Sequence, residues 1–119
     1  MAGKSELGKL GEDLACQYLK KNGYKIIERN YRQPWGELDI VAVSPKKILV
    51  FVEVKTIKGS NPMITAEDHL TRAKLKKLQR TASLYANASK FLTDKGWRID
   101  LLAVTIETEE TKIKHYKNI

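Results

Sequence analysis

Residues 36–56, GELDIVAVSPKKILVFVEVKT, form the stretch that decides the fold. Two runs rich in β-branched residues, GELDIVAV and KILVFVEVK, flank the turn-forming segment SPKK, and this pattern predicts an antiparallel β-hairpin. The hairpin contains the longest apolar runs of the chain, yet its outer ends carry Glu37, Asp39, Glu53 and Lys55. Ionisable side chains are rarely buried without partners, so the placement of these four needs a chemical reason.

Strand geometry predicts where the charges lie. Successive side chains alternate between the two faces of a strand, so one face of the hairpin is expected to be apolar throughout. That apolar face would consist of Leu38 with Val54, Ile40 with Val52, and Ala42 with Val50. A hairpin centred on Lys46 would place on the other face Val43 with Leu49, Val41 with Phe51, Asp39 with Glu53, and Glu37 with Lys55. The charges therefore gather at the open end, while apolar pairs near the turn anchor the hairpin.

Asp39 and Glu53 would then face each other at roughly 5 Å between Cβ atoms, where like charges destabilise a sheet. One interpretation is a partly exposed ion-pair cluster, in which Lys55 compensates the acids with Glu37 beside it. The other is a divalent metal site, because carboxylate oxygens are the ligands that Mg²⁺ and Mn²⁺ prefer. In that case Lys55 would be placed to orient an attacking water and to stabilise charge on a phosphate.

Helix and strand patterns continue on both sides of the hairpin. Ser5 can cap a first helix and Gly23 can end it, because a left-handed residue is needed there. The expected elements are helices over 5–22 and about 65–88, strands over 24–32, 36–43, 47–55 and 97–107, and a weak edge strand over 112–119. Residues 57–64 are expected to form an irregular loop of the kind that often carries function. The order α, β, β, β, α, β predicts one α/β domain over residues 1–119.

Composition narrows the class of protein. The chain has 22 Lys and Arg against 14 Asp and Glu, a net charge of +8 that favours polyanionic partners such as nucleic acid. A single cysteine, Cys16, excludes an internal disulfide and favours a reduced, cytoplasmic protein. No stretch resembles a signal peptide or approaches the roughly 20 apolar residues of a membrane span. We expect a soluble protein without a membrane partner.

The second helix is expected to carry a basic face distinct from its apolar face. Arg72, Lys76 and Arg80 recur at helical spacing, and Lys74 and Lys77 flank them. Such a stripe could contact DNA phosphates, for affinity rather than sequence readout, or could serve solubility alone. Basic residues in segments flanking the hairpin could extend the same surface, namely Arg29, Arg32 and Lys58.

Four further residues attract attention. Glu12 falls just beyond the apolar arc of the first helix, which favours a solvated surface glutamate over one that reaches the hairpin charges. Trp35 could stack on a base near those charges, although an ordinary packing role is the commoner fate of a tryptophan. His69 and His115 lack metal-ligand spacing, and we expect both to be incidental.

An acid on the first helix, an aspartate on the second strand and Glu-X-Lys on the third resemble the PD-(D/E)XK nuclease superfamily. More narrowly, GKLGEDLACQYLKKNGYKIIERNYR, GELDIVAV and FVEVKT resemble the YraN-type family of small uncharacterised bacterial proteins, itself similar to archaeal Holliday junction resolvases. The resemblance covers the chain from Leu7 to about Glu107. Its specific part is GELD followed after 13 residues by EVK, with GE on the leading helix.

The resemblance implies a restriction-endonuclease-like fold, with an αβββαβ core and a mixed central sheet flanked by helices. It implies that Asp39, Glu53 and the Val54 carbonyl bind Mg²⁺ or Mn²⁺, that Lys55 is the catalytic lysine, and that Glu12 is the acid of the first helix. The contiguous Pro-Asp dipeptide is absent, so Glu37 could share or replace the role of Asp39.

The leading hypothesis is therefore a metal-dependent endonuclease-like domain that acts on DNA, including branched or structured DNA. The alternatives are a nucleic-acid-binding module that keeps the fold without turnover, and an interaction domain whose charges form ion pairs. The similarity to junction resolvases also raises a homodimer as an expectation.

Overall fold

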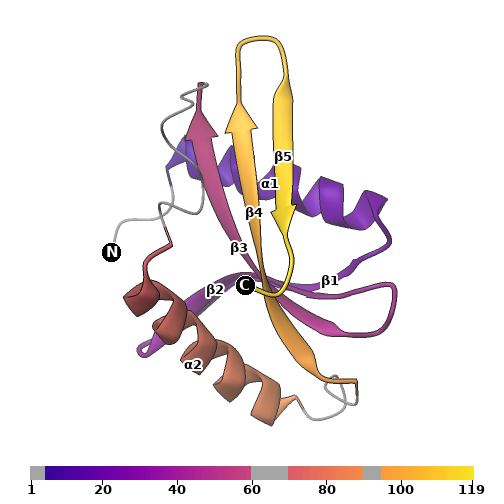
Figure 1. The fold of residues 1–119 in the computed structure, drawn as a ribbon, viewed down its shortest axis with the longest axis vertical. Helices are drawn as coiled ribbons and strands as arrows, with labels where there is room; N and C mark the ends of the chain where they lie inside the picture. The colour runs from indigo at the N-terminus through magenta and orange to yellow at the C-terminus, as the bar shows by residue number, and fades with distance from the viewer. Residues whose placement is uncertain (1–4, 60–69, 90–94) are drawn as a thin grey trace.

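Five strands form one sheet in the order β1-β2-β3-β4-β5, with a helix on each face (Figure 1). In the computed structural model the described residues are 5–59, 70–89 and 95–119. Their elements are α1 (Glu6–Lys21), β1 (Lys25–Gln33), β2 (Gly36–Val43), β3 (Leu49–Lys58), α2 (Arg72–Ala88), β4 (Trp97–Ile106) and β5 (Thr111–Tyr116). The predicted single α/β domain with a mixed sheet is confirmed.

Among the strands of the described residues, β3 and β4 alone run parallel, which makes the sheet mixed, and the connection between them includes α2. The other neighbouring strands are antiparallel. The predicted C-terminal edge strand is confirmed as β5, which pairs with β4 from Leu101–Tyr116 to Ile106–Thr111. Neither of the two helices among the described residues has the length and apolarity that crossing a bilayer requires.

α1 packs its apolar side against one face of the sheet. Ser5 caps the helix by accepting a hydrogen bond from the amide of Gly8, as predicted. Gly23, at φ +85°, follows the last turn, and the Tyr24 amide bonds to the Leu19 carbonyl. This is the hydrogen-bond pattern of a glycine-terminated helix. The core on this face consists of Ala15, Cys16, Leu19, Tyr24, Ile40, Ala42, Val50, Val52, Leu102 and Val104.

α2 covers the opposite face. Its core contacts bring together Leu38, Val41, Leu49, Phe51, Leu78, Ala82, Ala86 and Ile99. Thr71 caps the helix by accepting a hydrogen bond from the Lys74 amide. The predicted helix start near Thr65, residue His69 and residues 60–64 of the predicted loop lie outside the described residues.

The predicted register of the hairpin holds near the turn and fails at its open end. Val43 pairs with Leu49 and Val41 with Phe51, as expected. The ladder ends at Ile40 and Val52, so the expected pairs of Asp39 with Glu53 and Glu37 with Lys55 do not form. The amide of Val54 instead donates a hydrogen bond to the side chain of Asp39. Strands β2 and β3 therefore separate where the charges begin.

The alternation along β2 also breaks at this point. Leu38, expected beside Ile40, packs with Val41 in the core under α2. On β1, Asn30 has φ 53° and lies between the pairs Arg29–Ile40 and Tyr31–Leu38. The left-handed conformation of Asn30 interrupts the regular pleat of the sheet, and the prediction that side chains alternate strictly between the two faces assumes that pleat. The expectation of one wholly apolar hairpin face was therefore wrong at Leu38.

Candidate active site

Asp39 lies at the fork between β2 and β3. Its side chain is buried, and Oδ2 accepts a hydrogen bond from the Val54 amide at 2.8 Å. The strand ladder would otherwise supply a backbone carbonyl for that amide. The carboxylate thus takes over a hydrogen bond of the sheet, which fixes its position beside the backbone of β3.

Glu53 and Lys55 are half-buried on β3 and border two hollows at this end of the sheet. The α1 hollow, about 270 Å³, is lined by Ser5, Leu7, Gly8, Asp39, Glu53, Val54, Lys55 and Thr56. The α2 hollow, about 370 Å³, is lined by Glu37, Glu53, Lys55, Leu70, Lys74, Lys77, Leu78, Thr81 and Leu101. The two hollows adjoin because Glu53 and Lys55 belong to both.

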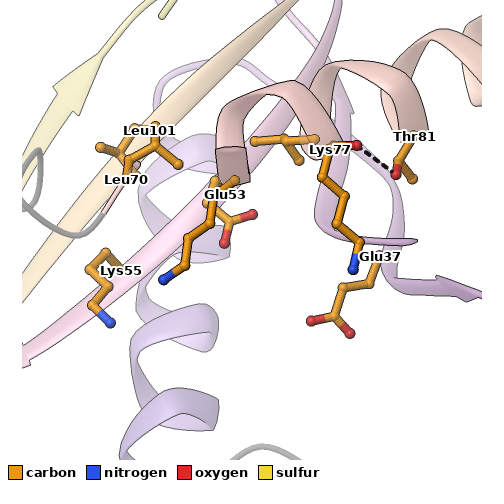
Figure 2. Close-up of a pocket in the computed structure, with 9 residues that line it drawn as sticks. Glu37, Glu53, Lys55, Leu70, Lys77, Thr81 and Leu101 are labelled. Atoms are coloured by element: carbon orange, nitrogen blue, oxygen red, sulfur yellow. Dashed lines mark hydrogen bonds between the residues drawn. The ribbon is translucent and has the colours of Figure 1, made fainter. Parts of the chain in front are cut away.

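The α2 hollow is strongly charged at its mouth. Figure 2 shows the carboxylates of Glu37 and Glu53 and the amines of Lys55 and Lys77 around a common space. Thr81 forms part of its wall, and its hydroxyl donates a hydrogen bond to the Lys77 carbonyl at 2.9 Å. Lysines from the helix and the sheet thus converge on one opening, where a phosphate could meet several ammonium groups.

Glu37 and Asp39 line different hollows. The side chain of Glu37 is 66% exposed, and its Oε2 lies 3.8 Å from Nε of Arg32 on β1. An ion pair this long and this exposed contributes little to stability. The expected partnership between Glu37 and Lys55 within the ladder is absent, although both residues line the α2 hollow.

Glu12 is buried, with 1% of its surface exposed, so the helical-wheel expectation of a solvated glutamate was wrong. Its Oε1 accepts hydrogen bonds from Nδ2 of Asn30 at 2.8 Å and Nε of Arg29 at 3.2 Å. The cause is the close approach of α1 to the sheet: a Cβ on Gly11 would lie 1.9 Å from Oγ1 of Thr56. Among the described residues, those lining the two hollows do not include Glu12.

The basic residues divide into two groups. Lys74 and Lys77 line the α2 hollow, whereas Arg72, Lys76 and Arg80 are exposed and do not line it. Arg29 contacts Asp13 at 2.6 Å as well as Glu12, and the hydrogen bond to Asp13 raises the pKa of its guanidinium. Arg29 thus orients Glu12. A phosphate contact by Arg29 stays a prediction.

The oxygen atoms at the fork between β2 and β3 could supply some of the ligands of a hard cation such as Mg²⁺. Asp39, Glu53 and the Val54 carbonyl would offer oxygen ligands, and Mg²⁺ commonly takes one or two carboxylates with water completing its shell. Across residues 5–59, 70–89 and 95–119, no three Asp, Glu, His or Cys side chains form a ready metal cluster. The fork is therefore compatible with an ion that keeps most of its waters, rather than with an all-protein cage.

A second buried polar cluster was missed by the sequence interpretation. Asp100 is fully buried. Its Oδ1 accepts a hydrogen bond from Nε of Arg98 at 2.9 Å, and its Oδ2 lies 2.7 Å from Nε2 of His115. The hydroxyl oxygen of Tyr18 lies 3.1 Å from Nδ1 of the His115 imidazole. His115 is therefore not incidental, because it links α1, β4 and β5. An acid inside the apolar run WRIDLLAV was the available signal that a partner was required.

Comparison with known proteins places the chain in a family. A family model described as uncharacterised protein family UPF0102 matches residues 11–104. The chain is 40% identical over 114 residues to a UPF0102 protein of Syntrophomonas wolfei, covering 95% of this chain and 96% of that protein. It is 42% identical over 112 residues to a UPF0102 protein of Thermotoga maritima, covering 93% and 94% respectively.

A UPF0102 protein of Fervidobacterium nodosum is 39% identical over 110 residues, which cover 92% of this chain and 78% of the relative. The family model begins within α1, spans the hairpin and ends within β4, so it covers most of the residues on which the family resemblance was based. The chain belongs to the uncharacterised protein family UPF0102.

Proposed function

We propose that this protein is a metal-dependent endonuclease-like domain that hydrolyses DNA phosphodiester bonds. The observation that carries the proposal is the α1 hollow, where Asp39, Glu53 and Lys55 meet beside the backbone of Val54. An aspartate on the second strand and Glu-X-Lys on the third are the arrangement on which the resemblance to PD-(D/E)XK nucleases is based. The net charge of +8 supports a polyanionic substrate.

Each side chain has a distinct task in this proposal. Asp39 and Glu53 would hold Mg²⁺ or Mn²⁺ together with the Val54 carbonyl. Glu12, which accepts hydrogen bonds from Asn30 and Arg29, would fix these two residues of β1 against α1. When bound, the ion would supply charge stabilisation at the phosphate and lower the pKa of a water. Lys55 would orient the attacking water and stabilise negative charge on the phosphate oxygens. Lys74 and Lys77 would hold the adjacent backbone phosphates.

Cleavage of supercoiled plasmid, linear duplex, single-stranded and four-way-junction DNA in Mg²⁺ or Mn²⁺ tests the proposal, with EDTA as the metal-free control. We expect Glu53→Gln and Lys55→Met each to lower the cleavage rate by about a hundredfold or more, a typical loss for one group that stabilises transition-state charge. Glu109→Gln, at an exposed acid in the β4–β5 turn, is the matched control and should cleave normally. Cleavage that persists in Glu53→Gln would identify a contaminating nuclease.

A nucleic-acid-binding module without turnover is the second candidate. It is favoured by one observation, that five basic side chains of α2 are exposed, namely Arg72, Lys74, Lys76, Lys77 and Arg80. This function predicts DNA binding that weakens with salt, and no cleavage in either metal. Charge reversal at Arg72, Lys76 and Arg80 would then weaken binding more than Asp39→Asn does.

A further inference from the structure

Trp35 is the large aromatic side chain at the tip of the β1–β2 hairpin. It is 43% exposed, and within the described residues it makes no ring contact. Trp97 differs, since its ring packs edge-on against Phe51 with centroids 5.6 Å apart. The exposed part of the Trp35 indole is therefore available to contact a ligand.

The tip that carries Trp35 is held rigidly. Gln33 pairs with Gly36, so Pro34 and Trp35 alone form the turn, and the proline ring fixes its own φ. Gly36 is buried against α2, where an added Cβ would lie 2.1 Å from Oγ1 of Thr81. A rigid support lowers the entropy cost of binding through the side chain that it presents.

The same contact joins the turn that carries Trp35 to the wall of the α2 hollow. Thr81, which touches Gly36, lines that hollow, and so does Glu37, two residues after Trp35. Lys77 and Arg80 lie four and one residues before Thr81 on the exposed side of α2. The turn that carries the exposed indole thus adjoins a helix with exposed cations, and ammonium or guanidinium groups with an aromatic platform are the combination that binds single-stranded nucleic acid.

We infer that Trp35 stacks on an unpaired nucleobase, and that the substrate class is DNA with a single-stranded segment or an opened end beside the cleaved phosphate. This rests on the proposed function, and it deepens that function by naming the substrate. In an intact duplex both faces of every internal base are covered by neighbouring bases. A fixed indole gains stacking energy only where a base is unpaired or terminal.

Fluorescence isolates this contact because Trp35 and Trp97 are the two tryptophans of the chain. In a Trp97→Phe protein, the Trp35 emission is titrated with oligonucleotides of equal length in EDTA, so that no cleavage occurs. We expect quenching by single-stranded DNA and by a duplex with an unpaired overhang, and little change with a duplex closed at both ends by non-nucleotide linkers, which contain no unpaired bases. Equal quenching by all three substrates would overturn the inference.

Anisotropy of labelled DNA provides the second measurement and needs no change at Trp97. Trp35→Ala should weaken binding of single-stranded and overhang DNA by about 5- to 150-fold, the range for loss of one stacked base. Trp35→Phe should recover most of that affinity, and Leu84→Ala, at an exposed apolar residue of α2, should bind as the unchanged protein does. Unchanged binding in Trp35→Ala would refute stacking.

The two proposals fail separately. Because the titrations contain no metal, a protein that stacks on unpaired DNA but cleaves nothing would overturn the nuclease activity and leave the stacking intact. A protein that cleaves closed duplex as fast as overhang DNA, with no loss in Trp35→Ala, would keep the nuclease and overturn the substrate class.

Discussion

The amide of Val54 donates a hydrogen bond to Oδ2 of Asp39 at 2.8 Å, just beyond the last ladder pair, Ile40 with Val52. The buried Asp39 carboxylate thereby replaces a backbone carbonyl as the hydrogen-bond acceptor where β2 and β3 separate. The hydrogen bond keeps the fork from leaving a backbone amide unsatisfied. It also holds the acid in the α1 hollow, beside Glu53 and Lys55.

Asp39→Asn and Asp39→Ala should separate these two roles. The asparagine keeps an oxygen that can accept from the Val54 amide, so we expect a small change in the free energy of unfolding and a loss of Mn²⁺ binding. The alanine removes the acceptor and should destabilise the protein by about 1–3 kcal/mol, the usual cost of an unsatisfied buried group. Urea denaturation and calorimetric titration with Mn²⁺ measure the two effects. Undiminished Mn²⁺ binding by Asp39→Asn would contradict a metal role for this carboxylate.

Gly11→Ala should destabilise the protein although alanine favours helix by about 1 kcal/mol. The new methyl group would lie 1.9 Å from Oγ1 of Thr56, so α1 must move away from β3, and such overpacking costs about 1–3 kcal/mol. Thr56→Ala in the same protein should recover part of the loss, because the hydroxyl and methyl groups that clash are removed. Lys9→Ala, at an exposed position of α1, serves as the control. Additive effects of Gly11→Ala and Thr56→Ala in thermal unfolding would rule out this contact as the cause.

Periodicity was sufficient to predict the hairpin near its turn. Apolar pairs such as Val41 with Phe51 are fixed by alternation and by the length of the turn, so the register there followed directly. The separation of β2 and β3 could not be predicted in this way. It depends on a hydrogen bond that the Val54 amide donates to the Asp39 side chain and on a left-handed Asn30, and neither changes the apolar pattern. The split of the charges between two hollows was unpredictable for the same reason.

Burial of polar residues was the other gap. Glu12 sits at the edge of an apolar arc, and a helical wheel contains no information about Arg29 and Asn30, which lie on another element. Asp100 and His115 likewise satisfy each other across two strands. A polar side chain can be buried when a residue distant in the sequence supplies its hydrogen-bond partner. The periodicity of a single sequence does not reveal which distant residues form such pairs.

The Asp100 cluster should make stability depend on acid pH. Burial alone would raise the pKa of Asp100, but hydrogen bonds from His115, Arg98 and the Asn118 amide outweigh it and lower the pKa below its ordinary value of 3.8. On acidification the unfolded chain therefore binds its proton first, which favours unfolding. The contribution is complete above the ordinary value and is lost as the pH falls through the lower, folded pKa.

Comparison of the unchanged protein with Asp100→Asn by urea denaturation from pH 7 to pH 3 measures that contribution. At pH 7 the variant should be less stable by about 1–3 kcal/mol, because a charged hydrogen-bonded group is lost from the interior. The difference should shrink below about pH 4. Glu109→Gln, with an exposed carboxylate, should show no such convergence. If the free energy of unfolding of Asp100→Asn and of the unchanged protein fell in parallel with pH, the lowered pKa of Asp100 in the folded protein would be contradicted.

Lys77 and Lys76 form a matched pair for testing the basic helix. They are adjacent and both exposed on α2, but only Lys77 lines the α2 hollow with Glu53 and Lys55. If DNA phosphates enter that hollow, Lys77→Gln should weaken binding at every salt concentration and reduce the slope of log affinity against log salt by about one. Lys76→Gln should change the slope less, because its ammonium lies outside the hollow. Anisotropy titrations at several salt concentrations measure both slopes, and equal slopes for the two variants would mean that the basic face attracts DNA only diffusely.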